Sequence, residues 1–461
     1  MSVFSNAGAR LLPSPYPMKK SILLVAVVSF VLPLSALAEE KKLDPLDQWA
    51  QWRGPLSTGV APHGDPPIEW SEGKNVRWKI AIPGRGHSSP VVWGDRIFLT
   101  TAMAFGDLLE PRHTHAHGAH DSMPARRQQK FVVLAVDRRS GSILWQTAVR
   151  TARPHADTHE TGSWASNSPV TDGEHVYASF GSGGLYCLDF KGELVWKVEL
   201  GDMKVKHDHG EGSSPALHGD TLVVNWDHEG QSFVIALDKR TGKERWKASR
   251  DEGTSWSTPL IVEHEGKHQV IIAATKRVRA YDLDNGHLIW QCSGLSGNVC
   301  ATPVSGGGFV YVANSYETRV MLAIRLSKAK GDITGTDAVA WTRDRYTPYV
   351  PSPLLYGDRL CYLKHYQGYL TCVHAKTGET LFGPERLPGI GNVYASIVGA
   401  ADRVYIVSLN GNAVVLERGA KFKVLARNRL DDSFAASPAI VGNEMFLRGE
   451  RNLYCIARSG G

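Results

Sequence analysis

Four side chains able to bind a metal ion or move a proton are concentrated in the stretch KHDHGEGSSP, residues 206–215. They are two imidazoles, His207 and His209, and two carboxylates, Asp208 and Glu211. Such groups at close range can bind zinc or a similar ion, or act as acid and base on a polar ligand. Neighbouring residues on a loop need not share a direction, so a solvated loop whose side chains bond one another is the competing interpretation.

A second group of histidines lies in the stretch AFGDLLEPRHTHAHGAHDSMPARRQQK. Alternating histidines on a polar segment have affinity for metal ions. The candidate metal ligands of this stretch are His113, His115, His117 and His120. A mobile loop and a lid over a neighbouring site are the alternatives, and we expect the insertion to span 103–130.

The N-terminus has the pattern of an export signal over residues 1–38. A basic pair precedes an apolar run from Ser21 to Leu32, and small residues ending at Ala38 form a cleavage site. The residues before Met18 do not fit an export signal, which makes Met18 an alternative start. No cysteine follows the cleavage site to accept a lipid. We therefore expect a periplasmic or secreted protein without a stable membrane span after cleavage.

Composition points to a β-rich chain and away from nucleic acid. The 461 residues include 46 glycines and 24 prolines, and apolar runs after the leader are short, which is typical of many strands joined by turns. The formal charge of +6 is modest for this length, and the basic residues form no stripe or recognised nucleic-acid motif.

A repeat with a period of about 41 to 50 residues, longer in the first unit, organises the chain. Each unit opens with a small residue, Ser or Thr, and Pro before a strand, and closes with an Asp, a Gly turn and a Trp. The openings are SSPVVWGD (88), NSPVTDGE (167), SSPALHGD (213), STPLIVEH (257), ATPVSGGG (301), PSPLLYGD (351), ASIVGAAD (395, without the proline) and ASPAIVGN (436).

Two incomplete units indicate how these repeats close into a ring. The last unit, from Ala436 onward, has three strands, whereas NVRWKIAIP at 75–83 is a lone Trp-bearing strand ahead of the first unit. One small sheet cannot bury both faces alone, so the units must pack radially. We predict an all-β, eight-bladed propeller of four-stranded blades over 75–461, with an entry segment at 39–74 and the N-terminal strand completing the C-terminal blade.

Residues that recur at one place in every unit are predicted to pack rather than react. A large flat ring can wedge between neighbouring blades. The recurring tryptophans are Trp78, Trp145, Trp196, Trp246, Trp290 and Trp341, and the cysteines that share a place in three units are Cys187, Cys372 and Cys455. None of the six cysteines forms a CxxC pair, so we expect the three recurring ones to be buried strand residues.

The repeat units LAVDRRSGSILW, YCLDFKGELVW and IALDKRTGKERW, with their S-x-P style openings, resemble the pyrroloquinoline-quinone (PQQ)-like propeller family. The resemblance covers residues 49–461. It implies the propeller fold and two contrasting roles. Quinoprotein dehydrogenases of this superfamily hold PQQ and a calcium ion, whereas the propeller of the outer-membrane assembly (BAM) complex is a non-enzymatic binder of partner proteins.

Polar and aromatic residues gather on the connections between blades and on the loops between second and third strands. In a propeller these segments share one face, here called the top face, at the mouth of the central channel. The candidate ligand-binding residues are Arg85, His87, His159, Glu160, Trp164, His207, Asp208, His209, Glu211, Asp227, His228, Trp256, Tyr316, Lys364, His365 and Arg448.

The sequence favours a binding module over an enzyme. The adjacent-cysteine ring that covers PQQ in the alcohol dehydrogenases is absent, and no Glu/Asn/Asp calcium set can be matched residue by residue. We expect the top face to hold an exported protein, peptide or glycan, without nucleic acid. A PQQ- or metal-dependent enzyme, either dehydrogenase-like or acting on carbohydrate, is the alternative, with PQQ and calcium or a transition metal as its cofactors.

Overall fold

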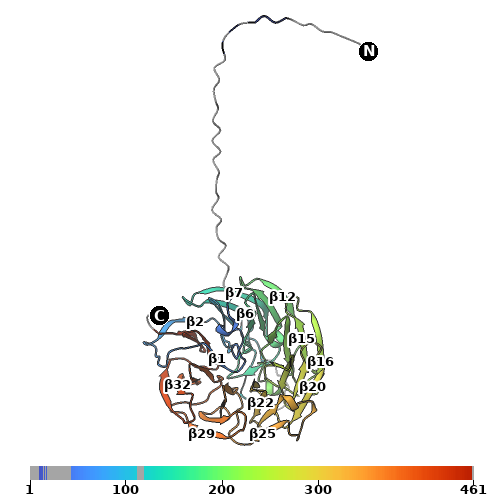
Figure 1. Cartoon of the computed structure of the whole chain (residues 1–461), viewed down its shortest axis with the longest axis vertical. Helices are drawn as coiled ribbons and strands as arrows, with labels where there is room; N and C mark the ends of the chain where they lie inside the picture. The colour runs from blue at the N-terminus through green and yellow to red at the C-terminus, as the bar shows by residue number, and fades with distance from the viewer. Residues whose placement is uncertain (1–9, 14, 16, 18–42, 112–118, 459–461) are drawn as a thin grey trace, which may run out of the picture. The chain divides into compact units, whose positions relative to one another are not determined.

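The computed structural model describes residues 10–13, 15, 17, 43–111 and 119–458. Leu43–Gly461 form one compact unit, which is a ring of blades in Figure 1. The predicted leader lies outside the described residues apart from a few positions before Met18, and so do His113, His115 and His117. In the described part of the chain, no helix has the length and apolar character needed to cross a lipid bilayer.

Eight antiparallel four-stranded sheets form the ring, as predicted, with chain order running from the centre outward in seven of them. Blades 1 to 4 are β3 (Val91–Trp93), β4 (Arg96–Phe105), β6 (Gln128–Asp137), β7 (Ile143–Ala152); β9 (Val170–Thr171), β10 (His175–Ser179), β11 (Leu185–Asp189), β12 (Leu194–Val198); β13 (Ala216–His218), β14 (Thr221–Trp226), β15 (Ser232–Asp238), β16 (Glu244–Arg250); and β17 (Leu260–His264), β18 (Lys267–Ala273), β19 (Arg277–Asp282), β20 (Leu288–Ser293). Blades 5 to 8 are β21 (Val304–Gly306), β22 (Phe309–Asn314), β23 (Val320–Arg325), β25 (Val339–Arg343); β26 (Leu354–Tyr356), β27 (Arg359–Leu363), β28 (Tyr369–His374), β29 (Thr380–Arg386); β30 (Val398–Ala400), β31 (Arg403–Val407), β32 (Asn412–Glu417), β33 (Val424–Arg429); and β34 (Ala439–Val441), β35 (Glu444–Arg448), β36 (Asn452–Ile456), β2 (Val76–Ala81).

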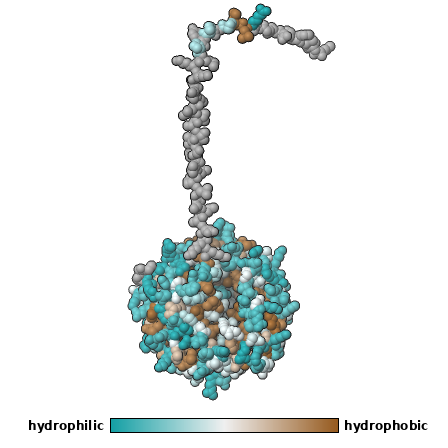
Figure 2. All heavy atoms as spheres, viewed as in Figure 1, coloured by the Kyte–Doolittle hydropathy of each residue, from teal (hydrophilic) through white to brown (hydrophobic). Residues whose placement is uncertain are grey.

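Small elements decorate this ring. Beyond the blades lie β1 (Val60–Ala61) beside β30, β24 (Gly331–Asp332) beside β20, the pair β5 (Ser122–Met123) and β8 (Thr158–His159), and the 3-10 helices η1 (Pro45–Asp47), η2 (Gly181–Gly183), η3 (Lys206–Asp208) and η4 (Leu326–Lys328). In blade 1, β4 ends at Phe105 and β6 begins at Gln128, so both strands reach into the stretch 103–130 that the sequence analysis assigned to the insertion. Hydrophilic residues are prominent around the rim of the unit in Figure 2.

The predicted ring closure is confirmed by strand pairing. β2 is the outermost strand of blade 8 and pairs antiparallel with β36, so that Trp78 lies opposite Cys455 and Ala81 opposite Asn452. The N-terminal strand therefore supplies the edge that the three C-terminal strands lack. Closure of this kind leaves no blade incomplete.

Trp78 and four of its counterparts bond the next blade of the ring, which confirms their predicted packing role. Trp290 instead donates to Gln269 of its own blade, at 2.9 Å. The Trp78 indole donates to the carbonyl of Arg138, at the turn between β6 and β7 of blade 1, at 3.1 Å. Gly141 of that turn has positive φ, and a Cβ there would approach the Trp78 ring to 2.8 Å. The same indole-to-turn bond recurs from Trp145, Trp196, Trp246 and Trp341. The glycine-containing turn between the third and fourth strands of a blade thus contacts the tryptophan of the preceding blade.

The Ser or Thr of each opening forms a closed hydrogen-bond belt around the channel. Each backbone N–H of the belt donates to the hydroxyl of the next blade, at 2.9 to 3.0 Å, through Ser89, Ser168, Ser214, Thr258, Thr302, Ser352, Ser396, Ser437 and back to Ser89. A proline follows every member except Ser396 and favours the extended backbone that each innermost strand needs. Even the weakest repeat therefore keeps its place in the belt.

The entry segment runs along the inner edges of several blades. Its strand β1 pairs in parallel with β30 on the inner edge of blade 7, near the centre of Figure 1. Trp49 pairs with Val92 of blade 1, and the buried Arg53 guanidinium donates to the carbonyls of Pro353 and Ile397 across the ring. Burial lowers the pKa of Arg53 to about 9. The segment thus spans the channel from one side to the other.

The three recurring cysteines are buried, as predicted, but one of them is not a free thiol. Cys187 and Cys455 are buried and reduced, whereas Cys372 of β28 forms a disulfide with Cys361, its partner across the β27–β28 ladder. Sequence position in the repeat could not show this bond, because only blade 6 places a second cysteine opposite the recurring one.

Candidate functional site

A cavity of about 350 Å³ lies at the top face of the ring. Its walls are the connections and loops that the sequence placed together, and its lining includes four serines of the hydroxyl belt, Ser89, Ser168, Ser214 and Ser437. Trp52 of the entry segment also lines it and donates its indole N–H to the Ser437 hydroxyl at 3.1 Å. The entry segment therefore helps to bound the cavity on its channel side.

One side of the cavity is a row of aromatic rings from blades 5 to 7. Tyr349 stacks on Tyr316 and on His365, with ring centroids 5.4 Å and 4.7 Å apart. His365 contacts Tyr366 at 4.4 Å, and Tyr366 stacks on Tyr394 at 5.5 Å with an interplanar angle of 12°. These five residues, here called the aromatic row, all line the cavity. Ring order places them across the channel from blades 1 to 3.

Imidazoles dominate the other side. His87, His159 and His209 are half-buried and line the cavity, together with exposed His120. Burial lowers the pKa of His209 to about 4, and burial with the nearby Arg448 and Arg85 guanidinium groups lowers that of His87 to about 3. Burial also lowers the pKa of His159. These three rings are therefore neutral at pH 7.

The C-terminal part of the blade 1 insertion is docked on this side. β5 pairs with β8, and the Ser122 hydroxyl donates to the His207 carbonyl at 3.0 Å. The His209 ring contacts the rings of His120 and His159, with centroids 5.0 Å and 4.6 Å apart, and its Nε2 lies 3.0 Å from the His120 carbonyl oxygen. The insertion and the KHDHGEG stretch thus build one histidine cluster. Within the described residues, no group of three or more His, Cys, Asp or Glu side chains is arranged to hold a metal ion.

Glu211 lies where the main cavity meets a side cavity of about 140 Å³. Its carboxylate accepts bonds from the Ser182 backbone N–H and hydroxyl, both at 2.5 Å, and lies 4.0 Å from His155. Burial raises the pKa of Glu211. The hydrogen bonds to Ser182 fix the carboxyl group in place, so it forms a rigid polar corner of the lining.

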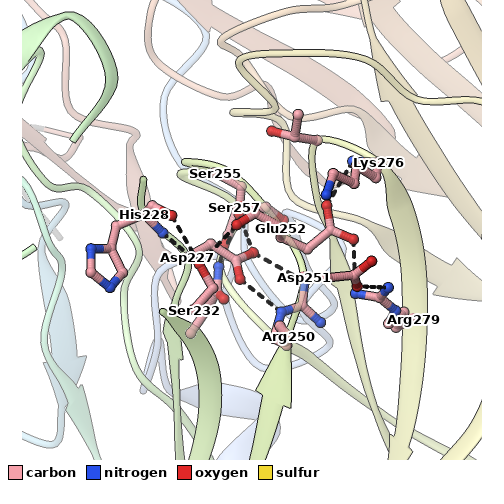
Figure 3. A network of polar contacts seen from close by, with 12 residues as sticks. Asp227, His228, Ser232, Arg250, Asp251, Glu252, Ser255, Ser257, Lys276 and Arg279 are labelled. Atoms are coloured by element: carbon pink, nitrogen blue, oxygen red, sulfur yellow. Dashed lines mark hydrogen bonds and ion pairs between the residues drawn. The ribbon is translucent and has the colours of Figure 1, made fainter. Parts of the chain in front are cut away.

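Asp227 belongs to a buried charge network in blades 3 and 4 (Figure 3). Its carboxylate receives two bonds from Arg250, at 2.7 and 3.0 Å, and one from the Ser255 hydroxyl at 2.7 Å. The side chains of Asp227 and Arg250 are both fully buried. Arg279 bonds Glu252 at 2.8 Å in the same network. Two carboxylates and two guanidinium groups are thus paired inside the protein.

The structure divides the predicted site residues into two groups. Those that line the cavity are His87, His120, His159, His209, Glu211, Trp256, Tyr316 and His365. Those that are not among its described lining residues are Arg85, Glu160, Trp164, His207, Asp208, Asp227, His228, Lys364 and Arg448.

Several members of the second group have evident packing or positioning contacts. Arg448 is buried and donates to the Thr100 carbonyl at 2.6 Å, and burial lowers its pKa to about 9. Trp164 donates to the Ala156 carbonyl at 3.0 Å, and buried His228 accepts the backbone N–H of Lys204 at 3.0 Å. Arg85 donates to the Glu160 carbonyl. Asp208 is buried beside His207 in η3, and burial raises its pKa.

Lining residues that sequence reasoning did not single out include four aromatic side chains. Tyr349 and Tyr394 lie on connections between blades and Tyr366 on the loop between β27 and β28, whereas Trp52 lies in the entry segment. Cys300 also lines the cavity, and burial raises the pKa of its thiol to about 12. The available signal was a tyrosine in each of three successive top-face segments.

The described lining does not match what PQQ requires. PQQ is a tricarboxylate that needs a cation near its quinone oxygens and a carboxylate base. Among the described lining residues there is no lysine or arginine to pair with its carboxylates. Asp121 and Glu211 are the two acidic residues of that lining, and no calcium-binding set accompanies them. The aromatic row could stack on a flat ring, but the charges that would hold this cofactor are missing from the described lining.

Comparison with known proteins matches this chain to PQQ-repeat propellers. A family model described as outer membrane protein assembly factor BamB matches residues 129–383. The chain is 22% identical to polyvinylalcohol dehydrogenase from Pseudomonas sp over 348 residues, covering 56% of this chain and 54% of that protein. It is 26% identical to BamB from Alkalilimnicola ehrlichii over 212 residues, covering 45% and 51%. The chain thus spans about half the length of the curated relatives it matches.

Two solved structures share the fold. BamB from Moraxella catarrhalis superposes with a TM-score of 0.51 at 15% identity, covering 78% of this chain and 99% of that one. Quinohemoprotein alcohol dehydrogenase from Comamonas testosteroni gives a TM-score of 0.58 at 10% identity, covering 91% and 82%. One of these proteins is a dehydrogenase and the other an assembly factor, so the similarity shows a shared fold and does not identify a shared function.

Proposed function

Because the chain belongs to the family described as outer membrane protein assembly factor BamB, we propose that it is a non-catalytic binding module that holds a ligand in its top-face cavity. The observation that carries this proposal is the lining: an aromatic row faces neutral imidazoles. Such a lining offers stacking and hydrogen bonding. A rigid ring with varied loops suits recognition, because recognition needs no reactive group.

We further propose that the protein works outside the cytoplasm. Two observations support this, the export pattern over residues 1–38 and the Cys361–Cys372 disulfide, since disulfides persist in oxidising compartments. The ligand is then an exported protein, a peptide or a glycan. The name of the BamB relatives is consistent with a role at the cell envelope.

A cavity-filling variant tests the proposal. Gly212 lines the cavity without positive φ, and a Cβ there would meet Trp256 at an ordinary 3.4 Å, so Gly212→Leu should fold and occupy the site. Gly73 is exposed, and a Cβ added there would have no neighbouring atom within 4 Å, which makes Gly73→Leu the matched control. Each protein is titrated with neutral oligosaccharides, short peptides, and PQQ with calcium, while Trp fluorescence and melting temperature are recorded.

We expect a saturable ligand response in the wild type and Gly73→Leu that Gly212→Leu lacks, without alcohol-dependent reduction of an electron-acceptor dye. Equal binding by Gly212→Leu would show that the cavity is not the binding site. The polyvinylalcohol dehydrogenase relative supplies the competing function. Saturable PQQ binding accompanied by dye reduction would establish that function and overturn the binding-module proposal.

A further inference from the structure

Resting on the proposed binding function, we propose that the ligand of the top-face cavity is an uncharged saccharide. Sugar rings combine two properties that few other ligands share: a flat face of C–H groups and a rim of hydroxyls that both donate and accept. The cavity lining shows a counterpart to each property, and its described residues include no positive charge that an anionic ligand would require.

The aromatic row supplies the surface for the flat faces. The ring planes of Tyr366 and Tyr394 are nearly parallel, with an interplanar angle of 12°, and those of Tyr349 and His365 make an angle of 19°. These rings are half-buried, whereas Tyr316 at the end of the row is 39% exposed. The row therefore leads from solvent into the cavity. Large rigid rings of this kind give contact area at little cost in conformational entropy.

The imidazoles opposite supply hydrogen bonds of the right type. A neutral imidazole carries one donor and one acceptor. His159 Nδ1 is bonded to Thr161 and His209 Nε2 to the His120 carbonyl, so each of these two rings keeps one nitrogen for a ligand hydroxyl. His87, His159 and His209 are held neutral by burial. A phosphate or a carboxylate would instead need a fixed positive charge beside it.

The hydroxyl belt adds donors at the bottom of the same cavity. Ser89, Ser168, Ser214 and Ser437 each accept the backbone N–H of a neighbouring belt residue. Within the described part of the chain, none of these four hydroxyls donates to a protein acceptor. Their O–H groups are therefore available to acceptor oxygens of a ligand.

The volume of the cavity and the charges of its lining residues narrow the class of saccharide further. A cavity of about 350 Å³ lies at the low end of ligand pockets, about 300 to 1,000 Å³, which fits a short saccharide or the end of a longer one. The described lining has no lysine or arginine, so uronic acids and sulfated or phosphorylated sugars lack a counter-charge. An extended peptide would pair with exposed strand edges, but loops and connections build most of this lining.

The test compares matched trisaccharides by isothermal titration calorimetry on the purified full chain. Maltotriose, cellotriose and chitotriose are the neutral probes, trigalacturonate is the anionic probe, and Gly-Tyr-Gly with blocked ends is the neutral peptide probe. We expect at least one neutral trisaccharide to bind, with trigalacturonate at least about tenfold weaker because no fixed positive charge meets its carboxylates.

Three variants locate the binding. Tyr366→Ala should weaken the Kd for the neutral sugar by about tenfold or more, whereas Tyr366→Phe, which keeps the ring, should stay within about threefold. Tyr369→Ala is the control, because Tyr369 is exposed on β28 and is not among the lining residues. A loss with Tyr366→Phe as large as with Tyr366→Ala would overturn the stacking argument.

The outcomes separate this inference from the proposed function. If the peptide binds, and Gly212→Leu abolishes that binding while no neutral sugar binds, the saccharide inference is overturned and the binding module stands. If trigalacturonate binds as tightly as the neutral sugars, the charge argument is wrong. If no probe binds the wild type differently from Gly212→Leu, both the inference and the proposed function fail.

Discussion

Replacing Arg250 by methionine tests whether Asp227 is a structural residue or part of a ligand site. Arg250 and Asp227 lie in the charge network of Figure 3, with both side chains fully buried and a contact of 2.7 Å. The Asp227 carboxylate raises the pKa of Arg250 against the effect of burial, so the guanidinium stays charged. Removing the guanidinium leaves a carboxylate in the interior with the Ser255 hydroxyl as its remaining bonded side chain.

The expected cost of Arg250→Met is about 3 to 5 kcal/mol in the free energy of unfolding, the usual range for leaving one member of a buried ion pair alone. A unit of this length loses about 1 °C of melting temperature per kcal/mol, so the melting temperature should fall by about 3 to 5 °C. The double variant Asp227→Leu/Arg250→Met removes both charges and should recover most of that loss, because the attraction in such a pair barely exceeds the cost of burying it.

Circular dichroism melts at pH 7 and physiological salt measure these changes. The control is Arg240→Met, since Arg240 is 72% exposed and its contact with Asp220, at 3.4 Å, is screened by solvent. A loss for Arg250→Met no larger than the control's would refute the desolvation argument. If folded Arg250→Met also loses ligand binding that the double variant does not restore, Asp227 would instead act at the ligand site.

Three further predictions follow from other parts of the ring. The folded pKa values of His87 and His209, about 3 and 4, lie below the ordinary 6.5, so the unfolded chain binds protons more readily than the folded chain as the pH falls. The melting temperature should therefore fall as the pH drops from 6.5 toward 4. In thermal melts recorded over this pH range, His87→Gln should show a smaller fall than the wild type. Deleting residues 75–83 removes β2 and should abolish the cooperative melting transition, and hydrogen exchange in β36 should become fast. A stable truncated protein would contradict the role of β2 in closing the ring. Ser396→Ala leaves the Ser352 N–H without its acceptor and should cost about 1 kcal/mol in urea unfolding, and no change would show that solvent replaces the bond.

The blade number, closure and tryptophan contacts could be predicted because they repeat. Each blade solves the same packing problem, so the same residues return at the same spacing, and even ASIVGAAD, without its proline, keeps Ser396 in the belt. Ring closure followed from counting strands at the two ends. Repetition thus turns a weak local pattern into a strong global one.

The position of the cavity could be predicted from the sequence, but the full set of side chains that line it could not. A loop carboxylate such as Asp227 has the same local sequence character whether it faces a ligand or a buried arginine on another strand of its blade. Which one it meets depends on side-chain direction, and loops have no period to reveal it. Trp52 could not be foreseen as a lining residue, because the entry segment has no counterpart in the repeat and crosses the ring by contacts distant in sequence.

The bond between Trp52 and Ser437 joins residues 385 positions apart. The cavity lining therefore includes residues from both ends of the ring, and these two meet only when the last blade is in place beside the entry segment. Under the proposed function, ligand binding therefore depends on a complete ring. A chain cut short before Ser437 would lack both this contact and the strand β36 that pairs with β2.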